Sequence, residues 1–243
     1  MKILHKAVLL VLSFFFPRSC MACGQDLPYD SKALLCNKCE KELKIPGPLI
    51  CKRCGVELKD GGAHCFNCRG HKEDNFKCKL IRSAFVFNTS SRALVHALKY
   101  QGADYAGKYM GRLMAARYKE LPELANVDVL VPVVLFKKRL RKRGYNQSEV
   151  LARALGQILN LPVDSTCLTR TRNTPSQTKL GRKARLENMT GAFRCVDASH
   201  IKRKTVLLID DVATTGATLE GCAQALKSAG AKRVFAYTFA REN

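Results

Sequence analysis

A short apolar run near the C-terminal end of the chain predicts a buried strand, followed by a loop and a helix. Residues 206–209 are apolar without alternation, which is typical of a strand covered on both faces in a parallel sheet. Asp210 and Asp211 follow where this run ends, and apolar residues at helical spacing extend from 219 to 226, before Gly230. Because ligands of open α/β sheets bind outside the carboxyl ends of the strands, this strand end is a candidate site.

The same succession of apolar runs and helical stretches continues back through the C-terminal two thirds of the chain. Residues 83–87 and 127–131 have the pattern of strands, and helical spacing runs from 94 to 98, from 105 to 114 and from 151 to 158. Because strands alternate with helices, we predict an α/β domain in which an open, mostly parallel sheet is flanked by helices.

The N-terminus has a different pattern. Apolar residues 7–16 follow Lys2 and Lys6, as in a signal peptide, but no small-x-small cleavage site follows them. About ten apolar residues also fall short of the roughly 20 that span a membrane. We therefore predict a short apolar helix packed on the protein within residues 1–19, no membrane span and a cytoplasmic location. A cleaved signal peptide is the alternative.

The charge of the chain indicates partners that are rich in negative charge. Lys and Arg number 42 against 20 acidic residues, a formal net charge of +22, which favours nucleic acid or phosphate-rich substrates. Residues 137–143 carry six positive charges in seven positions, shortly after Pro132. We expect these residues to form a cationic loop beside the candidate site, although such runs are often only solvated surface.

Cysteine pairs predict two metal centres before the α/β domain. Nine of the twelve cysteines lie before residue 79, and eight of them form C-x-x-C pairs. Two such pairs, separated by a loop of 10 to 20 residues or so, make a closed four-thiolate Zn²⁺ site with a structural role. We predict a double zinc ribbon over residues 20–78 in which consecutive pairs share a metal. The predicted ligands are Cys20, Cys23, Cys36 and Cys39, then Cys51, Cys54, Cys65 and Cys68.

Two alternatives to this arrangement remain open from the sequence. The pairs could be interleaved between the two metals. A secreted disulfide framework would also use paired cysteines, but it accounts poorly for the unpaired Cys167, Cys195 and Cys222.

The loop after the two acids has the composition of a phosphate site. Residues 214–218 are Thr-Thr-Gly-Ala-Thr and lead into a helix, where unpaired N–H groups and the helix dipole favour an anion. Asp210 and Asp211 suit the two vicinal hydroxyls of a ribose whose 5-phosphate lies in the loop. The simpler interpretation is an ordinary strand, turn and helix with solvated acids.

A long polar connection lies between this strand and the preceding elements. Residues 170–180 are rich in Arg, Thr, Asn, Ser and Gln, the composition of a mobile active-site lid. Arg172 is the cation in it that we would test first.

These features together resemble two known groups of proteins. Residues 205–218 resemble the phosphoribosyl diphosphate (PRPP) signature of type I phosphoribosyltransferases, and the whole chain resembles the ComF family, which includes ComFC-like and GntX-like proteins. Val134 departs from that family, which often has a second proline there. The motifs that carry the resemblance are Leu98-Lys99-Tyr100, Val131-Pro132-Val133, Arg143-Gly144-Tyr145-Asn146-Gln147, the 170–193 segment with Gln177, Arg185 and Asn188, and the 210–218 segment.

The resemblance implies a type I phosphoribosyltransferase-like domain over residues 79–243 and assigns roles to individual residues. Asp210 and Asp211 would contact the ribose hydroxyls, and the loop after Pro132 would face the diphosphate. The catalytic set would be Asp210, Asp211, Lys99 and Arg172. The PRPP-binding set would be Asp210, Asp211, Val212, Ala213, Thr214, Thr215, Gly216, Ala217, Thr218, Val133, Arg139 and Arg143.

Three functions are consistent with this resemblance. The first is Mg²⁺-dependent transfer of phosphoribosyl from PRPP to an unidentified nitrogen acceptor, linked to competence or DNA uptake. The second is a non-catalytic accessory protein that binds single-stranded DNA, contacts DNA-uptake or helicase proteins and keeps the PRPP site for regulation. The third is a PRPP-sensing regulator.

Overall fold

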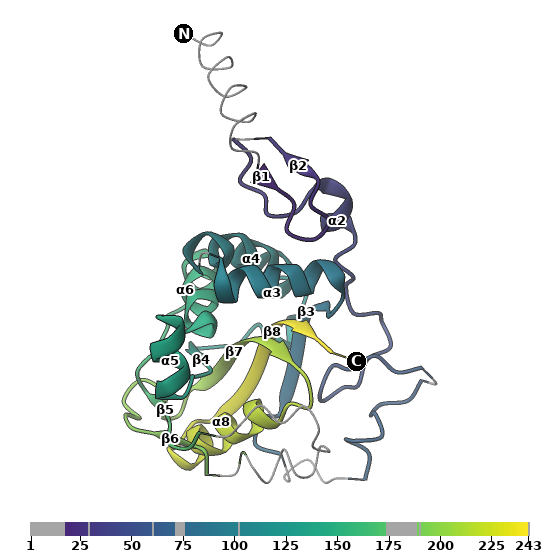
Figure 1. Ribbon diagram of the computed structural model, residues 1–243. Coiled ribbons are helices and arrows are strands. Elements are labelled where there is room, and N and C mark those ends of the chain that lie inside the picture. Colours follow the sequence, from purple (N-terminus) through teal and green to yellow (C-terminus); the bar gives the residue numbers. More distant parts are fainter. Residues whose placement is uncertain are drawn as a thin grey trace.

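A four-stranded parallel sheet forms the centre of the molecule (Figure 1). Its strand order is β3-β8-β7-β4, so the predicted strand over residues 206–209 is interior and pairs on both sides. The strands are β3 (Leu80–Val86), β4 (Val129–Pro132), β7 (Thr205–Ala213) and β8 (Arg233–Arg241). The computed structural model describes residues 18–28, 30–59, 61–70, 76–101, 103–173, 189 and 191–242.

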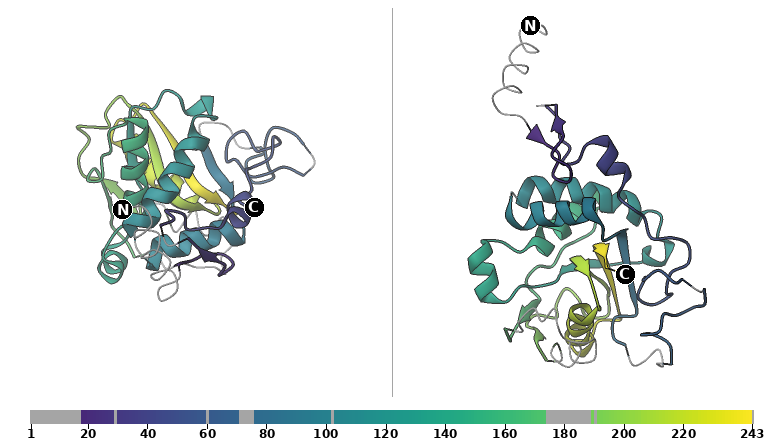
Figure 2. Two further views of the ribbon diagram at one scale, coloured as in Figure 1. Left: turned by 90° about the horizontal axis from the view of Figure 1, so that it is seen from above. Right: turned by 45° about the vertical axis from the view of Figure 1, so that its right-hand side comes forward.

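Helices cover both faces of the sheet, which confirms the predicted α/β architecture (Figures 1 and 2). One layer consists of α3 (Thr89–Tyr100), α4 (Ala103–Tyr118) and α6 (Gln147–Leu159). The opposite face carries α8 (Ala217–Ser228), next to the antiparallel pair β5 (Leu168–Arg170) and β6 (Phe193–Cys195). Two further helices among the described residues of this part are η2 (Pro122–Leu124) and α5 (Lys137–Arg143).

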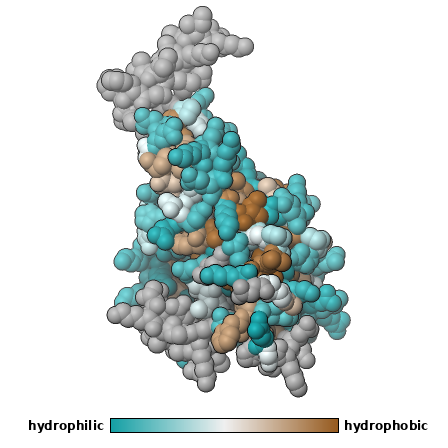
Figure 3. Space-filling view, turned by 90° about the vertical axis from the view of Figure 1, so that its right-hand side faces the viewer, coloured by the Kyte–Doolittle hydropathy of each residue, from teal (hydrophilic) through white to brown (hydrophobic). Residues whose placement is uncertain are grey.

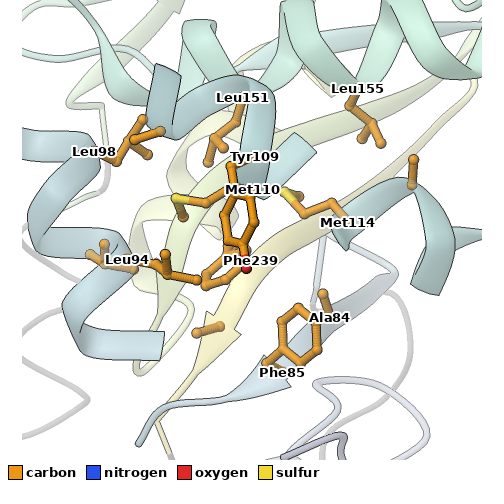
Figure 4. Close-up of a cluster of buried hydrophobic side chains, with 14 of the residues drawn as sticks. Ala84, Phe85, Leu94, Leu98, Tyr109, Met110, Met114, Leu151, Leu155 and Phe239 are labelled. Atoms are coloured by element: carbon orange, nitrogen blue, oxygen red, sulfur yellow. The ribbon is translucent and has the colours of Figure 1, made fainter. Parts of the chain in front are cut away.

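Alternate residues of β7 supply the two cores. Leu207 and Ile209 are fully buried against the layer of α3, α4 and α6, where leucines and methionines of the helices meet Phe239 of β8 (Figure 4). Val206 and Leu208 point to the other face and pack with α8. Because both faces of the strand are covered, no polar residue interrupts positions 206–209 between Thr205 and Asp210, as the apolar run predicted.

The end of β7 differs from the prediction. The strand continues to Ala213, beyond the two acids, because β8 is long enough to pair with it as far as Arg241. On its other side β4 ends at Pro132, opposite Ile209. At the two acids, β7 therefore pairs with β8 on one side only. On the other side β4 has already ended, which leaves space beside the acids.

The N-terminal cysteine-rich part makes two separate contacts with the α/β part. The first ribbon contains β1 (Arg18–Ser19), β2 (Asp26–Leu27) and α2 (Asn37–Lys41). Its buried residues, such as Leu34 and Leu35, join the core of the α3 and α4 layer. The second ribbon joins the α8 core through its cysteines. Seen from the ribbon side, most described residues are hydrophilic, with apolar ones gathered in the middle of the face (Figure 3).

Residues 1–17, which contain the apolar run of the predicted N-terminal helix, lie outside the described residues, and residues 18 and 19 form β1. Among the helices that the structure does describe, none is both long and apolar enough to cross a membrane.

Candidate functional site

The two acids are buried and are held by the helices of one layer. Lys99, in the last turn of α3, places its Nζ 2.5 Å from Oδ2 of Asp211. Ser148, at the start of α6, donates its hydroxyl to Oδ1 of Asp210 at 2.7 Å, and the Asp211 N–H donates to the same oxygen at 2.9 Å. Only 8% of Asp210 and 5% of Asp211 is exposed. We call these four residues the acid site.

The acids differ in their affinity for protons. Burial and the neighbouring charge of Asp211 raise the pKa of Asp210 well above its ordinary value. Burial acts in the same direction on Asp211, but the charge of Lys99 and hydrogen bonds from Asp210, Lys99 and Gln147 outweigh it and lower the pKa of Asp211. Asp211 is therefore the member that ionises first, as expected for two coupled carboxyl groups with unequal partners.

The loop after β7 has the geometry of an anion site. Gly216 has a φ of +77° and caps α8 without a side chain, so the first N–H groups of this helix have no capping oxygen from that residue. A Cβ at Gly216 would lie 3.1 Å from Cδ1 of Ile81. Both conditions favour glycine, and the helix start offers N–H groups and a positive dipole end to a phosphate. We call residues 214–218 the phosphate loop.

Hydrogen bonds join three of the sequence motifs to one another beside the acid site. The hydroxyl of Tyr145 donates to the carbonyl of Leu98 at 2.5 Å, next to Lys99 in the chain. Nδ2 of Asn146 donates to the carbonyl of Val133 at 2.9 Å. The N–H of Val133 donates in turn to the carbonyl of Ile209 at 2.9 Å, directly before the acids. Motifs that are far apart in the sequence thus form one structural unit.

The cationic segment is a helix, not the loop that we predicted. Residues 137–143 form α5, which ends at Gly144 with a φ of +83°. Left-handed glycine is a common helix end, and cations in the last turn are favourable for the helix dipole. The guanidinium of Arg143 lies 5.6 Å from the centre of the Tyr100 ring and donates to Oε1 of Gln147. The predicted cationic surface is therefore present on a short helix.

Two residues near the acids were not predicted as site residues. Ser148 binds Asp210 directly, but a serine at the start of a helix carries no signal of such a role. Arg170 on β5 is 9% exposed, and burial and the charge of Arg139 lower its pKa while the charge of Asp210 raises it. We predicted Arg170 to belong to the lid, whereas it is the last residue of β5.

The lid prediction falls largely outside the described residues, which include residues 170–173 but not 174–188. Gln177, Arg185 and Asn188 are among the residues left out. Arg172 is described and exposed, near Gly191. Its catalytic role stays a prediction.

The eight paired cysteines form two clusters that fit Zn²⁺. Within each cluster all sulfur atoms lie within 4.8 Å of one another. The Sγ atoms of Cys23 and Cys36 are 3.7 Å apart, and those of Cys54 and Cys65 are 3.6 Å apart. Four sulfurs at about 2.3 Å from a tetrahedral zinc would be about 3.8 Å from one another. The clusters are Cys20, Cys23, Cys36 and Cys39, and Cys51, Cys54, Cys65 and Cys68.

This grouping confirms the sequential pairing and excludes the interleaved one. The cysteines are free thiols in the part of the chain that is described, so the disulfide alternative is wrong. Hydrogen bonds between neighbouring sulfurs lower the pKa of Cys51 and raise that of Cys54.

Comparisons with known proteins agree with both parts. Residues 11–69 match the double zinc ribbon domain family, and residues 145–243 match the phosphoribosyl transferase domain family. Competence protein F of Haemophilus influenzae is 30% identical over 232 residues, which cover 93% of this chain and 98% of that protein. DNA utilization protein YhgH of Escherichia coli K12 is 28% identical, covering 93% and 97%. Competence protein ComFC of Bacillus subtilis is 28% identical, covering 98% and 96%.

The limits of the predicted parts, 1–19, 20–78 and 79–243, stay predictions. The two family matches leave residues 70–144 between them.

Proposed function

Because the chain belongs to the ComF family, we propose that the acid site and the phosphate loop bind PRPP with Mg²⁺ and transfer its phosphoribosyl group to a nitrogen acceptor. The observation that carries this proposal is the position of two buried acids directly before a glycine-capped helix start. Carboxylates accept hydrogen bonds from vicinal hydroxyls, and the helix start accepts a phosphate. A ribose 5-phosphate presents both groups within one small molecule.

In this proposal each residue contributes through charge or hydrogen bonding. Asp210 and Asp211 hold the ribose hydroxyls, and the phosphate loop, with Val212 and Ala213 before it, holds the 5-phosphate. Val133, Arg139 and Arg143 face the diphosphate. Lys99 keeps Asp211 ionised through the ion pair described above, and its positive charge also lies where the diphosphate would leave.

The proposed reaction breaks the bond between ribose C1 and the diphosphate oxygen and forms a bond from C1 to the acceptor nitrogen. The diphosphate leaves with the bonding electrons, and positive charge develops on the ribose ring in the transition state. Mg²⁺ bound with PRPP would neutralise charge on the leaving diphosphate. The protein's own part is preorganised electrostatics, so no side chain needs to become a covalent nucleophile.

Titration of PRPP and Mg²⁺ into the protein tests the binding step. Each acid would make charge-assisted hydrogen bonds worth about 1.5 to 3 kcal/mol, so the double variant Asp210→Asn with Asp211→Asn should bind PRPP about 100-fold more weakly or not at all. Asp104→Asn removes an exposed acid that pairs with Lys108 and serves as the control. Equal affinity of wild type and double variant would exclude this site. Diphosphate release with a panel of nucleobases then tests turnover.

The single variants are expected to change stability in opposite directions. The unfolded chain ionises Asp210 above a pKa of about 4, whereas the folded chain resists this because its pKa is raised. Asp210→Asn should therefore raise the melting temperature at pH 7.

The pKa of Asp211 is lowered, so its ionised form contributes stability that is present above about pH 4 and is lost as pH falls through the folded pKa. Asp211→Asn should lower the melting temperature, and melting curves at pH 4 and pH 7 check both signs.

A second candidate function is binding of single-stranded DNA, for which the net charge of +22 is the favouring observation. Lys137, Lys138, Arg141 and Lys142 are exposed on α5, outside the proposed PRPP contacts. Replacing these four by Gln should weaken binding of a single-stranded oligonucleotide and reduce its salt dependence. Unchanged affinity would place any DNA surface elsewhere. Contacts with DNA-uptake or helicase proteins and a cytoplasmic location stay predictions.

A further inference from the structure

The carboxylate of Glu220 links the second ribbon to α8, the helix that follows the phosphate loop. Glu220 lies in the first turn of α8, four residues after Gly216, and its N–H donates to the carbonyl of Gly216 at 2.9 Å. Its carboxylate accepts hydrogen bonds from the N–H groups of Lys77 and Cys78 at 2.5 and 3.2 Å, and from Nη2 of Arg53 at 3.1 Å. Glu220 thus has partners in the loop, in the segment after the ribbon and inside the ribbon.

The partner inside the ribbon also touches the metal cluster. Arg53 stands between Cys51 and Cys54, and its Nη1 donates to Sγ of Cys68 at 3.4 Å. The Arg53–Glu220 pair is well covered, with 11% and 17% of the two side chains exposed. A pair of this kind holds a fixed geometry better than an exposed pair does, because little water competes for it.

A second contact route from the same knuckle reaches the same loop. The N–H of Ile81 donates to the carbonyl of Arg53 at 2.8 Å. A Cβ at Gly55 would lie 2.7 Å from the carbonyl oxygen of Ile81, so the backbone of the knuckle lies directly against β3. The other end of Ile81, its Cδ1, lies against Gly216. The metal cluster and the phosphate loop are thus separated by one residue on this route.

We propose that Arg53 and Glu220 are positioning residues that transmit the geometry of the second cysteine cluster to the phosphate loop, so that Zn²⁺ in this cluster and PRPP bind cooperatively. With the metal bound, the knuckle is fixed and Arg53 holds Glu220 and the start of α8 in place. Without the metal, the positions of the four cysteines and of Arg53 are no longer fixed. The inference rests on the proposed PRPP site and adds a partner to it.

Cooperativity of this kind is reciprocal, which supplies the readout. If zinc strengthens PRPP binding, then PRPP must strengthen zinc binding by the same factor. Release of zinc to a chelator from the full-length protein is expected to show two phases, one for each cluster. Zinc that is bound more tightly is released more slowly, so PRPP should slow one phase, by up to the typical coupling factor of about tenfold, and should leave the other unchanged. A merely structural role for Glu220 would not produce this selective protection.

Variants of Arg53 and Glu220 should remove the coupling between zinc and PRPP binding without removing the metal. Glu220→Gln and Arg53→Met should each retain two zinc ions and a cooperative melting curve, bind PRPP about tenfold more weakly by calorimetry, and lose the protection of zinc by PRPP. Arg53→Lys keeps a cation and should restore part of both effects. Lys44→Met is the matched control, because the Lys44–Glu57 pair belongs to the ribbon part but is 61% exposed at the lysine.

The outcomes separate the two proposals. If the wild type does not bind PRPP at all, the proposed function fails. If the wild type binds PRPP but PRPP protects neither phase or both phases equally, or if Glu220→Gln keeps full protection, the coupling is wrong while the proposed function stands.

Discussion

The two zinc ribbons have the same knuckle but different neighbours. In each ribbon the first C-x-x-C pair is followed by a glycine in the left-handed region, Gly24 with a φ of +76° and Gly55 with a φ of +71°. The first ribbon lies against the helix layer, where the hydroxyl of Tyr109 on α4 donates to Glu40 of α2 at 2.5 Å. The second lies against β3 and α8, next to the phosphate loop.

One position in the knuckle shows what this difference means. The residue before the second cysteine is Ala22 in the first ribbon and Arg53 in the second. Alanine has no group that could bind a neighbouring element at a distance, whereas Arg53 binds Glu220 of α8. The same cysteine pattern is therefore joined to a different element in each ribbon, and the side chain at this knuckle position makes the difference.

Loss of one metal site should produce the largest difference between the ribbons. Cys51→Ser and Cys36→Ser each remove one ligand from a four-cysteine cluster, and structural zinc contributes about 10 kcal/mol of folding free energy in small ribbons. Each variant should lose one of two zinc ions. Cys51→Ser should also bind PRPP about tenfold more weakly, the coupling factor proposed above, whereas Cys36→Ser should keep the wild-type affinity. Zinc content and PRPP calorimetry on both proteins check this, and an equal loss of PRPP binding would refute the distinction.

The two knuckle glycines offer a smaller and cleaner contrast. A Cβ at Gly24 would meet no atom within 4 Å, whereas a Cβ at Gly55 would lie 2.7 Å from the backbone oxygen of Ile81. Gly24→Ala should cost only the left-handed strain, about 1 kcal/mol, and Gly55→Ala about 3 kcal/mol once the clash is added.

Chemical denaturation gives both free energies of unfolding. We expect weaker PRPP binding in Gly55→Ala alone, because only that clash displaces Ile81. If the two variants lost equal stability, the close approach of the second ribbon to β3 would be wrong.

Much of this architecture could be predicted because its signals are local. The apolar run before Asp210 predicted an interior strand, since a strand covered on both faces tolerates no polar alternation. The cysteine spacing predicted both clusters, because two residues between thiolates suffice for a chelating turn. Helical spacing predicted the helix that contains residues 94–98, and its start is also set locally, because Asn88 caps α3 by accepting from the N–H of Ser91 at 3.0 Å.

What could not be predicted depends on contacts between distant residues. No sequence signal connects Glu220 to Arg53, which lies 167 positions earlier, or Ser148 to Asp210. The true end of β7 depends on β8, a strand that the sequence pattern did not lead us to predict. The helical form of residues 137–143 depends on Gly144 acting as its left-handed end, and the density of cations in this stretch suggested a loop instead.

The smallest expected effect lies at the contact that holds the first ribbon to the helix layer. Tyr109→Phe removes the hydroxyl that donates to Glu40. Hydrogen bonds to charged groups contribute about 1.5 to 3 kcal/mol, and because Glu40 is exposed we expect about 1 kcal/mol of lost stability. PRPP affinity should stay within twofold of wild type, since among the described residues the hydrogen bonds of the first ribbon go to the helix layer and to β3, not to the phosphate loop. Chemical denaturation gives the free energy of unfolding of this variant, and PRPP titration compares its affinity with that of Glu220→Gln. A fall in PRPP affinity similar to that of Glu220→Gln would mean that both ribbons, and not only the second, act on the site.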